Sequence, residues 1–273
     1  MSRSRKTIGL ITGMGELPLA VAREARRQGY GLAAANLEGL ADGNLGELAR
    51  ASAWFNIGKV GGIMKFFKSE GATEALMAGK VPRSVLYRGG IRPDLKGARI
   101  LFRLRDRSDD AVIRVISEEF EKEGIRFLDI RDFCRELLTP EGKLTRKAPG
   151  RALKGDMEFG FRMARECGRL GIGQTVVVKE RAVIAVEAAE GTDEAIRRGG
   201  ELSGGGATVA KASRPGQDMR FDVPVVGLDT MAAMEEARAA ALVLEAGASI
   251  LLDRDEFIRR AEAAGIAVVG ASA

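Results

Sequence analysis

The 273-residue chain contains no histidine. This absence excludes Ser-His-Asp and Cys-His nucleophilic catalysis, imidazole acid-base chemistry and every zinc or iron site that requires a histidine ligand. Any catalysis must therefore use carboxylates, Lys or Arg, hydroxyls, backbone amides, or a hard metal ion with oxygen ligands.

Cysteines, aromatic residues and long apolar runs are also scarce. The two cysteines, Cys134 and Cys167, form no CxxC motif, which favours a reducing, cytoplasmic compartment, and the apolar helical stripe around Cys167 predicts a packed thiol. Aromatic residues make up 5%, and no nucleic-acid-binding signature is present, so we expect no nucleic-acid partner. No run reaches the roughly 20 apolar residues of a membrane span, and no signal peptide is expected.

The composition that is present is that of a globular protein with one or two domains. Hydrophobic residues make up 45% and charged residues 30%. The 43 basic and 38 acidic side chains give a net charge of +5, which suits an anionic ligand such as a phosphate ester or a lipid headgroup surface.

The first forty residues predict a βαβ unit. A strand at Thr7–Ile11 leads through Gly13 and Gly15 to a helix over 17–28 and a second strand over 31–37. The helix N-terminus offers amides to an anion, so the two glycines are candidates for phosphate contact. The alternative is that they only form the tight turn, because the third glycine of a dinucleotide fingerprint is missing.

Two further N-terminal segments carry candidate ligand contacts. Lys80 and Arg83 follow a predicted strand over 75–78, where they face either an anion or solvent. Ser108 and Asp109 precede a predicted helix over 111–123, where they either cap the helix or act in function.

A basic segment with two prolines, residues 137–152, predicts a connection between domains. We therefore expect an α/β protein with a Rossmann-like N-terminal domain containing a parallel sheet (1–136), a linker (137–152) and a second, catalytic α/β domain (153–273).

The C-terminal half contains the densest polar chemistry. After predicted strands over 175–179 and 182–187, Thr192 and Asp193 are explained as helix-start residues, whereas Glu187 and Glu190 are not, which favours a functional role for at least one of these glutamates. The segment 217–223, if extended, places Asp218, Arg220 and Asp222 on one face. Such a face suits Mg²⁺ or Mn²⁺ and phosphate, and the alternative is an ordinary surface ion-pair ladder.

Several motifs together resemble the LpxI-type UDP-2,3-diacylglucosamine pyrophosphatases of lipid A synthesis. The resemblance runs nearly end to end and in the same order. Its motifs are Leu10–Pro18, Gly79–Val81, Ser108–Ala111, Phe120–Gly124, Gly171–Gln174, Val186–Asp193 and Arg214–Pro224. Where relatives often have Lys-Pro, this chain has Arg214-Pro215, which keeps the charge but changes the donor geometry.

The resemblance implies hydrolysis of the pyrophosphate of UDP-2,3-diacylglucosamine to UMP and 2,3-diacylglucosamine 1-phosphate with Mg²⁺ or Mn²⁺, with water attacking the phosphorus on the sugar side. It implies a homodimer with the lipid product between two α/β domains, and a cytoplasmic protein that contacts the inner membrane surface peripherally. The family's essential aspartate falls on Asp222, which we expect to bind the metal or position the attacking water.

The remaining candidate residues follow from these motifs and from the charges described above. Asp218 and Arg220 are candidate catalytic residues beside Asp222, and Glu187 is a second candidate metal ligand. Lys211 and Arg214, with Arg220, are expected to neutralise the diphosphate. The expected substrate contacts are Gly13, Gly15, Lys80, Asp109, Asp110, Gln174, Glu190, Thr192, Asp193, Lys211, Arg214 and Gln217.

Two alternatives remain open at this stage. The first is a nucleotide-dependent oxidoreductase, in which Glu38, just past the second strand, would hold a ribose. The second is a non-catalytic carrier or sensor of an anionic lipid or sugar nucleotide, which would keep the basic residues but have no use for a metal.

Overall fold

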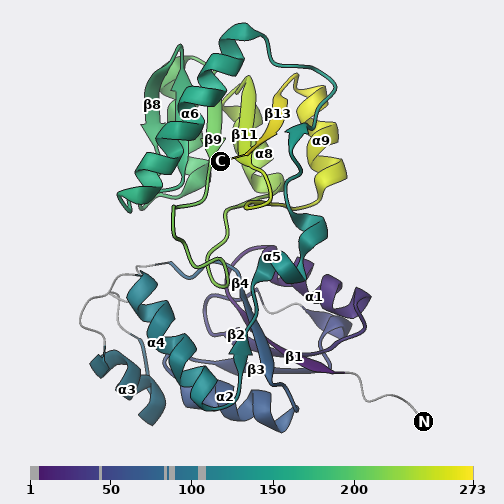
Figure 1. Cartoon of the computed structure of the whole chain (residues 1–273), viewed down its shortest axis with the longest axis vertical. Coiled ribbons are helices and arrows are strands. Elements are labelled where there is room, and N and C mark those ends of the chain that lie inside the picture. Colours follow the sequence, from purple (N-terminus) through teal and green to yellow (C-terminus); the bar gives the residue numbers. More distant parts are fainter. Residues whose placement is uncertain (1–5, 43–44, 83–84, 86–89, 104–108, 273) are drawn as a thin grey trace. The chain divides into compact units, whose positions relative to one another are not determined.

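Two large sheets, of five and six strands, organise the chain, and both contain many small and β-branched residues. A computed structural model describes residues 6–42, 45–82, 85, 90–103 and 109–272 (Figure 1). Its contacts divide the chain into an N-terminal unit, Met1–Cys134 with Asp218–Phe221, and a C-terminal unit, Arg135–Gln217 with Asp222–Ala273.

The N-terminal unit has a five-stranded parallel sheet in the order β3-β2-β1-β4-β5. This is the strand order of a Rossmann domain, so the prediction for the N-terminal fold is confirmed. The strands are β1 (Thr7–Thr12), β2 (Gly31–Leu37), β3 (Ala51–Phe55), β4 (Glu74–Ala78) and β5 (Arg126–Phe127). The helices are α1 (Leu17–Arg27), η1 (Gly46–Leu48), α2 (Val60–Ser69), α3 (Leu95–Arg103), α4 (Asp109–Lys122) and α5 (Ile130–Phe133).

The core of the N-terminal unit reaches a segment that is remote in sequence. The rings of Phe120 and Phe127 lie 4.8 Å apart, and Phe127 meets Phe221 edge to face at 4.9 Å. Aromatic pairs at this spacing are stabilising beyond the area that they bury. Phe221 therefore anchors Asp218–Phe221 in the N-terminal unit.

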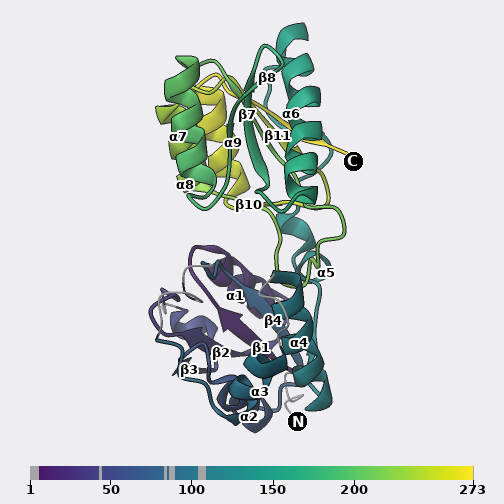
Figure 2. The ribbon, with the colours of Figure 1, turned by 90° about the vertical axis from the view of Figure 1, so that its left-hand side faces the viewer.

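The C-terminal unit has a mixed six-stranded sheet in the order β6-β13-β11-β9-β7-β8. Strands β9, β11 and β13 are parallel, whereas β6, β7 and β8 pair antiparallel with their neighbours. Helix α6 covers one face of the sheet, and α7, α8 and α9 cover the other (Figure 2). The expected second α/β domain is therefore present.

The elements of the C-terminal unit have the following bounds. They are η3 (Arg135–Leu137), β6 (Gly142–Lys143), α6 (Arg151–Arg169), β7 (Thr175–Lys179), β8 (Ala182–Val186), α7 (Thr192–Ser203), β9 (Thr208–Lys211), β10 (Val225–Val226), α8 (Leu228–Glu236), β11 (Ala241–Glu245), β12 (Ile250–Leu251), α9 (Arg254–Ala263) and β13 (Ala267–Ala271). Strands β10 and β12 form a separate parallel pair.

The segment 137–152, interpreted from its composition as a linker, includes part of this sheet. Gly142–Lys143 forms β6, which pairs with β13, and the amide of Leu144 donates to Val268 O at 2.9 Å. Its prolines and basic residues are typical of a connection, but a two-residue edge strand needs little local β-propensity because β13 supplies the hydrogen bonds.

Both cysteines are thiols. Cys134 is buried, and burial raises the pKa of its thiol to about 12. Cys167 packs against the core under α6, and burial raises its pKa too, which confirms the predicted packed thiol. Within the described part of the chain, no helix has the length and apolar character needed to cross a bilayer.

Candidate active site

The glycine turn after β1 and the loop after β4 are joined by backbone hydrogen bonds. The Gly13 amide donates to Ala78 O at 2.8 Å, and Met14 and Lys80 exchange two further bonds. A Cβ on Gly13 would lie 2.8 Å from Lys80 O, so this glycine is required for the close approach of the two loops. The structural interpretation of Gly13 is therefore sufficient.

Gly15 differs from Gly13. Its φ is +89°, and nothing lies within 4 Å of a Cβ built on it. The open space adjoins the N-terminus of α1, whose N-cap residue Glu16 provides no side-chain cap. A phosphate or another anion could approach the backbone here, at the carboxyl edge where doubly wound sheets bind ligands.

The other N-terminal candidates are less fully defined. The Lys80 side chain is exposed after β4. Asp109 and Asp110 belong to the first turn of α4, but their side chains lie outside what the structure describes, as do Arg83 and Ser108.

Nine candidate residues lie in the C-terminal unit, most of them along one edge of its sheet. Lys211 ends β9, Gln174 precedes β7 and Glu187 follows β8, and the antiparallel pairing of β7 with β8 and β9 brings these three strand ends together. Backbone bonds fix the arrangement: Ala212 N donates to Gln174 O at 3.1 Å, and Glu187 N donates to Thr175 O at 2.9 Å.

A chain of hydrogen bonds connects Lys211 with Glu187. The Lys211 ammonium donates to Thr192 Oγ1 at 2.6 Å, and the Thr192 hydroxyl donates to Glu187 Oε1 at 3.0 Å. Lys211 is only 6% exposed, and among the described residues its ammonium has no carboxylate partner. A buried cation bonded to one hydroxyl retains unused donors, which favours an anionic ligand at this place.

Glu190 and Asp193 have structural partners. Hydrogen bonds from its own backbone amide and from Arg198 hold the pKa of Glu190 below its ordinary value. Asp193 Oδ1 accepts from the Thr230 hydroxyl at 3.0 Å in the first turn of α7. Both side chains therefore help to fix the loop and helix that present Thr192.

The segment 217–223 is not extended, and the prediction that Asp218, Arg220 and Asp222 share one strand face is wrong. Pro215 and Gly216, with φ +77° at the glycine, start a turn in which Gln217 N donates to Arg214 O. A second turn joins Phe221 N to Asp218 O at 3.1 Å. Turn hydrogen bonds and the anchoring of Phe221 override the alternating pattern.

Asp218 and Arg220 bind each other in the N-terminal unit. Arg220 Nη2 lies 2.7 Å from Asp218 Oδ2 and Nε lies 2.9 Å from Oδ1, a two-pronged ion pair. These bonds hold the pKa of Asp218 below its ordinary range. The pair therefore stabilises the turn that leads to Asp222.

Asp222 is exposed at the start of the next stretch of the C-terminal unit. Its carboxylate accepts from the side-chain amides of Gln174, at 3.2 Å, and Gln217, and Gln217 also donates to Asp222 O at 2.8 Å. Gln217 Oε1 in turn accepts from Arg214 N at 2.7 Å. Two amides thus orient the Asp222 carboxylate, and the structure brings Gln174, Arg214, Gln217 and Asp222 together.

In the part of the chain that the structure describes, oxygen donors for a divalent ion are present, but no preassembled cage is. Among the described residues, no three His, Cys, Asp or Glu side chains converge as metal ligands. Glu187 Oε2 is buried without a hydrogen-bond partner, and Asp222 offers an exposed carboxylate. Mg²⁺ typically takes one or two carboxylates and completes its shell with water and substrate phosphates, so each of these carboxylates has the chemistry to bind such an ion.

Sequence reasoning missed Glu245 and Ser213. Glu245 ends β11 at the same sheet edge and is buried, and its Oε2 accepts from both the amide and the hydroxyl of Ser213 at 2.6 Å. This contact fixes the backbone between Lys211 and Arg214. The sequence feature that could have indicated Glu245 is its position directly after the apolar run 241–244.

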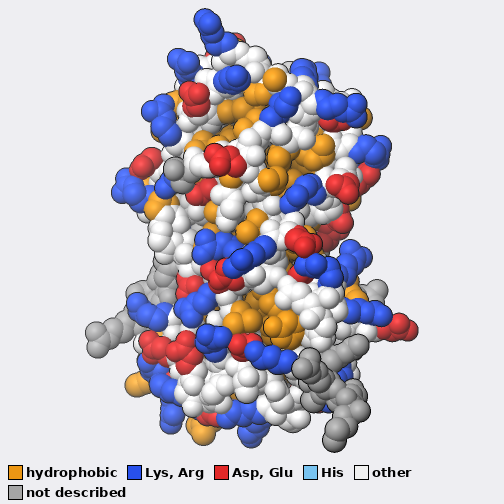
Figure 3. All heavy atoms as spheres, turned by 45° about the vertical axis from the view of Figure 1, so that its right-hand side comes forward, with side chains coloured by type: hydrophobic (Ala, Val, Ile, Leu, Met, Phe, Trp, Pro, Cys, Tyr) orange, Lys and Arg blue, Asp and Glu red, His pale blue; other side chains and the backbone are white. Residues whose placement is uncertain are grey.

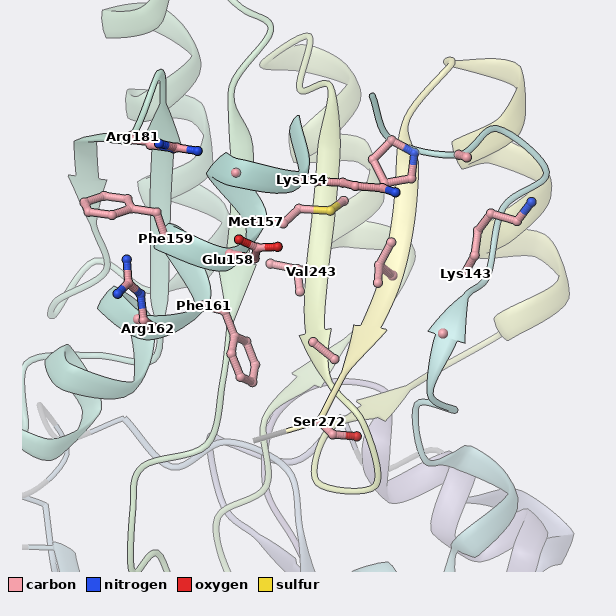
Figure 4. A pocket seen from close by; sticks show the side chains of 16 residues that line it. Lys143, Lys154, Met157, Glu158, Phe159, Phe161, Arg162, Arg181, Val243 and Ser272 are labelled. Atoms are coloured by element: carbon pink, nitrogen blue, oxygen red, sulfur yellow. The ribbon is translucent and has the colours of Figure 1, made fainter. Parts of the chain in front are cut away.

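A groove of about 890 Å³ in the C-terminal unit has a different set of lining residues from this polar edge. It runs beside α6 over β11 and β13 and is lined by apolar side chains such as Met157, Phe161 and Val243 with Lys154 and Arg162 (Figure 4). In Figure 3, hydrophobic side chains of this unit (upper half) lie among Lys and Arg. None of the described residues that line the groove is a predicted site residue.

The fold and the site define a two-domain α/β protein with a Rossmann unit and a basic, carboxylate-containing sheet edge suited to an anionic ligand. The family model of the LpxI N-terminal domain matches residues 7–137, and that of the LpxI C-terminal domain matches residues 140–269. The chain belongs to the LpxI family, which confirms the resemblance stated from its motifs.

A relative that is similar along nearly the whole chain supports this assignment. The chain is 35% identical over 276 aligned residues to the UDP-2,3-diacylglucosamine pyrophosphatase LpxI of Caulobacter vibrioides, with 97% of each chain covered. The likeness favours a pyrophosphatase over the oxidoreductase and over the non-catalytic carrier.

Proposed function

We propose that this chain hydrolyses the pyrophosphate bond of UDP-2,3-diacylglucosamine, releasing UMP and 2,3-diacylglucosamine 1-phosphate. The observation that carries the proposal is the likeness to the Caulobacter vibrioides enzyme along both domains. The sheet edge of the C-terminal unit supports the proposal from its chemistry, because it carries the buried ammonium of Lys211 and, through Gln174, orients the carboxylate of Asp222.

The groups at this edge suit phosphoanhydride hydrolysis. Lys211 and the first-turn amides of α7 offer positive charge to phosphoryl oxygens. The Asp222 carboxylate, which accepts hydrogen bonds from Gln174 and Gln217, is proposed to accept a hydrogen bond from the attacking water and to orient it. Water oxygen bonds to the phosphorus on the sugar side, the bridging oxygen departs with UMP, and the water protons pass to solvent and product.

Mg²⁺ or Mn²⁺ is part of the proposal, with Asp222 and Glu187 as the residues that would hold it. When bound, the ion supplies positive charge that stabilises the charge developing on the phosphoryl oxygens. We expect Mn²⁺ to raise the melting temperature of the wild-type protein and to raise that of Asp222→Asn less. Equal shifts would remove Asp222 from the ion's ligands.

The N-terminal unit is proposed to contribute ligand contacts and to position the segment that leads to Asp222. The open backbone at Gly15 and the exposed Lys80 are candidate contacts for the nucleotide or for a phosphate. Asp218 and Arg220, which sequence analysis placed among the catalytic residues, are proposed to position the segment that leads to Asp222, because they bind each other.

A cytoplasmic location, a homodimer and a peripheral contact with the inner membrane surface complete the proposal. Light scattering of the purified protein at several concentrations tests the dimer. A single monomeric mass at all of them would contradict it.

The activity test is release of UMP from UDP-2,3-diacylglucosamine with Mg²⁺ or Mn²⁺, followed by phosphorus NMR of both products. We expect UMP and the lipid 1-phosphate in equal amounts from the wild-type protein. Failure to release UMP with either ion, by protein that still binds the substrate, would favour a carrier.

A further inference from the structure

Helix α3 in the N-terminal unit presents its apolar side chains outward. Leu95 is 84% exposed and Phe102 is 93% exposed. These residues are seven positions apart and therefore lie on the same side of the helix, together with the exposed Ala98. Large apolar side chains that are exposed singly are ordinary, but a row of them on one helix marks an interaction surface.

Contacts on the opposite side fix this orientation. Gly97 and Ile100 are buried, and Asp94 Oδ1 accepts from Gly97 N at 2.8 Å at the start of the helix. Two basic side chains bind acids on or just after α4: Arg103 lies 2.8 Å from Glu119 of α4, and Lys96 lies 2.8 Å from Glu123, the residue that follows the helix. Lys96 and Arg103 thus help to attach the helix, while Leu95 and Phe102 remain outside.

The charge next to this face is positive. Arg99 lies one turn after Leu95 and flanks the apolar pair on the Leu95 side, and Arg92 precedes the helix; both are exposed and have no acidic partner among the described residues. Apolar side chains flanked by guanidinium groups suit the boundary of a bilayer that contains anionic lipid, where the rings and chains enter the acyl region and the guanidinium groups meet headgroup phosphates.

We propose that the exposed face of α3, formed by Leu95, Ala98, Arg99 and Phe102, docks on an anionic bilayer surface. The inference deepens the proposed function and rests on it, because an enzyme that acts on a lipid-linked sugar nucleotide must meet its substrate where the acyl chains are held. A second copy of the chain fits this face less well, because an isologous contact would bring the two Arg99 side chains near each other.

The test is co-sedimentation of the full chain with vesicles of phosphatidylethanolamine and phosphatidylglycerol. The double variant Leu95→Ser/Phe102→Ser is expected to partition roughly tenfold or more weakly than the wild-type protein. The matched control is Leu170→Ser/Leu202→Ser in the C-terminal unit, whose leucines are 63% and 66% exposed; it is expected to bind as the wild type does.

A charge pair of variants tests the basic component. Arg99→Glu is expected to weaken binding to the anionic vesicles, whereas Arg23→Glu, at an exposed position on α1, is expected to leave it unchanged. Phosphatidylcholine vesicles are expected to bind the wild type more weakly. Melting temperatures close to that of the wild type are expected for the variants, since none of these side chains is buried.

The outcomes separate this inference from the proposed activity. Binding to vesicles is measured without turnover, so α3-dependent binding by a protein that releases no UMP would support the docking face and contradict the proposed function. Equal partitioning of the wild type and the Leu95/Phe102 variant would overturn the docking face. Loss of self-association in that variant, without vesicle binding by the wild type, would also overturn it.

Discussion

The ammonium of Lys211 donates a 2.6 Å hydrogen bond to the hydroxyl of Thr192, at the first residue of α7. A buried cation thus lies beside the positive end of a helix dipole. Two nearby acids offset part of this positive charge: Glu187, which accepts a hydrogen bond from the Thr192 hydroxyl, and Asp193, in the first turn of α7. An anionic substrate would offset more of it.

Replacement of this cation should remove catalysis more than stability. We expect Lys211→Met to lower kcat/KM by about 100-fold or more, as loss of a charge-stabilising donor does in other active sites. Lys179→Met is the matched control, because the Lys179 ammonium binds the carbonyls of Ser203 and Gly205 at 2.8 Å. That variant should melt earlier and keep its kcat/KM. Wild-type kinetics in Lys211→Met would contradict the assignment.

The two aspartates of the 214–224 motif should behave differently. Asp222→Asn removes the charge that Gln174 and Gln217 orient, so we expect turnover to fall by about 1000-fold. Asp218→Asn weakens the pair with Arg220 and should cost about 1 kcal/mol in unfolding free energy, with turnover changed less than about tenfold. Steady-state kinetics and thermal melting distinguish the two variants, and a reversed order of effects would make Asp218 the catalytic carboxylate.

Much of this architecture could be predicted from short stretches of sequence, because buried strands and amphipathic helices each have a recognisable pattern of apolar residues. The second strand was predicted at 31–37, the bounds of β2. The turn at 217–223 could not be, because Phe221 packs on Phe127, far away in the chain, and this contact cancels the alternation that the residues suggest. Glu245 was missed because its role depends on the neighbouring strand β9 and on Ser213.

The glycines after β1 provide a prediction about packing. A Cβ at Gly13 would lie 2.8 Å from a backbone oxygen, so Gly13→Ala should cost about 1–3 kcal/mol. Gly15→Ala meets nothing and bears only the strain of its positive φ, about 1 kcal/mol. Denaturant unfolding should therefore rank Gly13→Ala as the less stable variant. If Gly15→Ala also raises KM without a change in kcat, ligand contact at that turn is supported; the opposite stability order would contradict the described geometry.

Acid stability should depend on Glu119 of α4. Its carboxylate is buried beside Lys122, Lys96 and Arg103, and the hydrogen bond from Lys122 is the main cause that lowers its pKa. Because the folded pKa lies below the unfolded value of about 4.3, this stabilisation is full above that pH and is lost as pH falls through the folded value.

At neutral pH the variant Glu119→Gln should therefore have a lower free energy of unfolding than the wild type, by about 1–3 kcal/mol, and a lower melting temperature. The difference between the two proteins should shrink as the pH falls. The measurement is thermal melting of both proteins at a series of pH values from neutral down to below the folded pKa of Glu119. The exposed Glu47, replaced by Gln, is a suitable control with little expected effect. A wild-type to Glu119→Gln difference that stays constant over the whole range would contradict the assigned pKa direction.

Hydrolysis of UDP-2,3-diacylglucosamine in heavy-oxygen water, with mass spectrometry of both products, tests the central claim most directly. The account predicts that the label enters the lipid 1-phosphate, that UMP stays unlabelled, and that Asp222→Ala, folded as the wild type is, forms almost no labelled product. Intact substrate after incubation of the wild-type protein with Mg²⁺ or Mn²⁺, or equal labelling by Asp222→Ala, would contradict it.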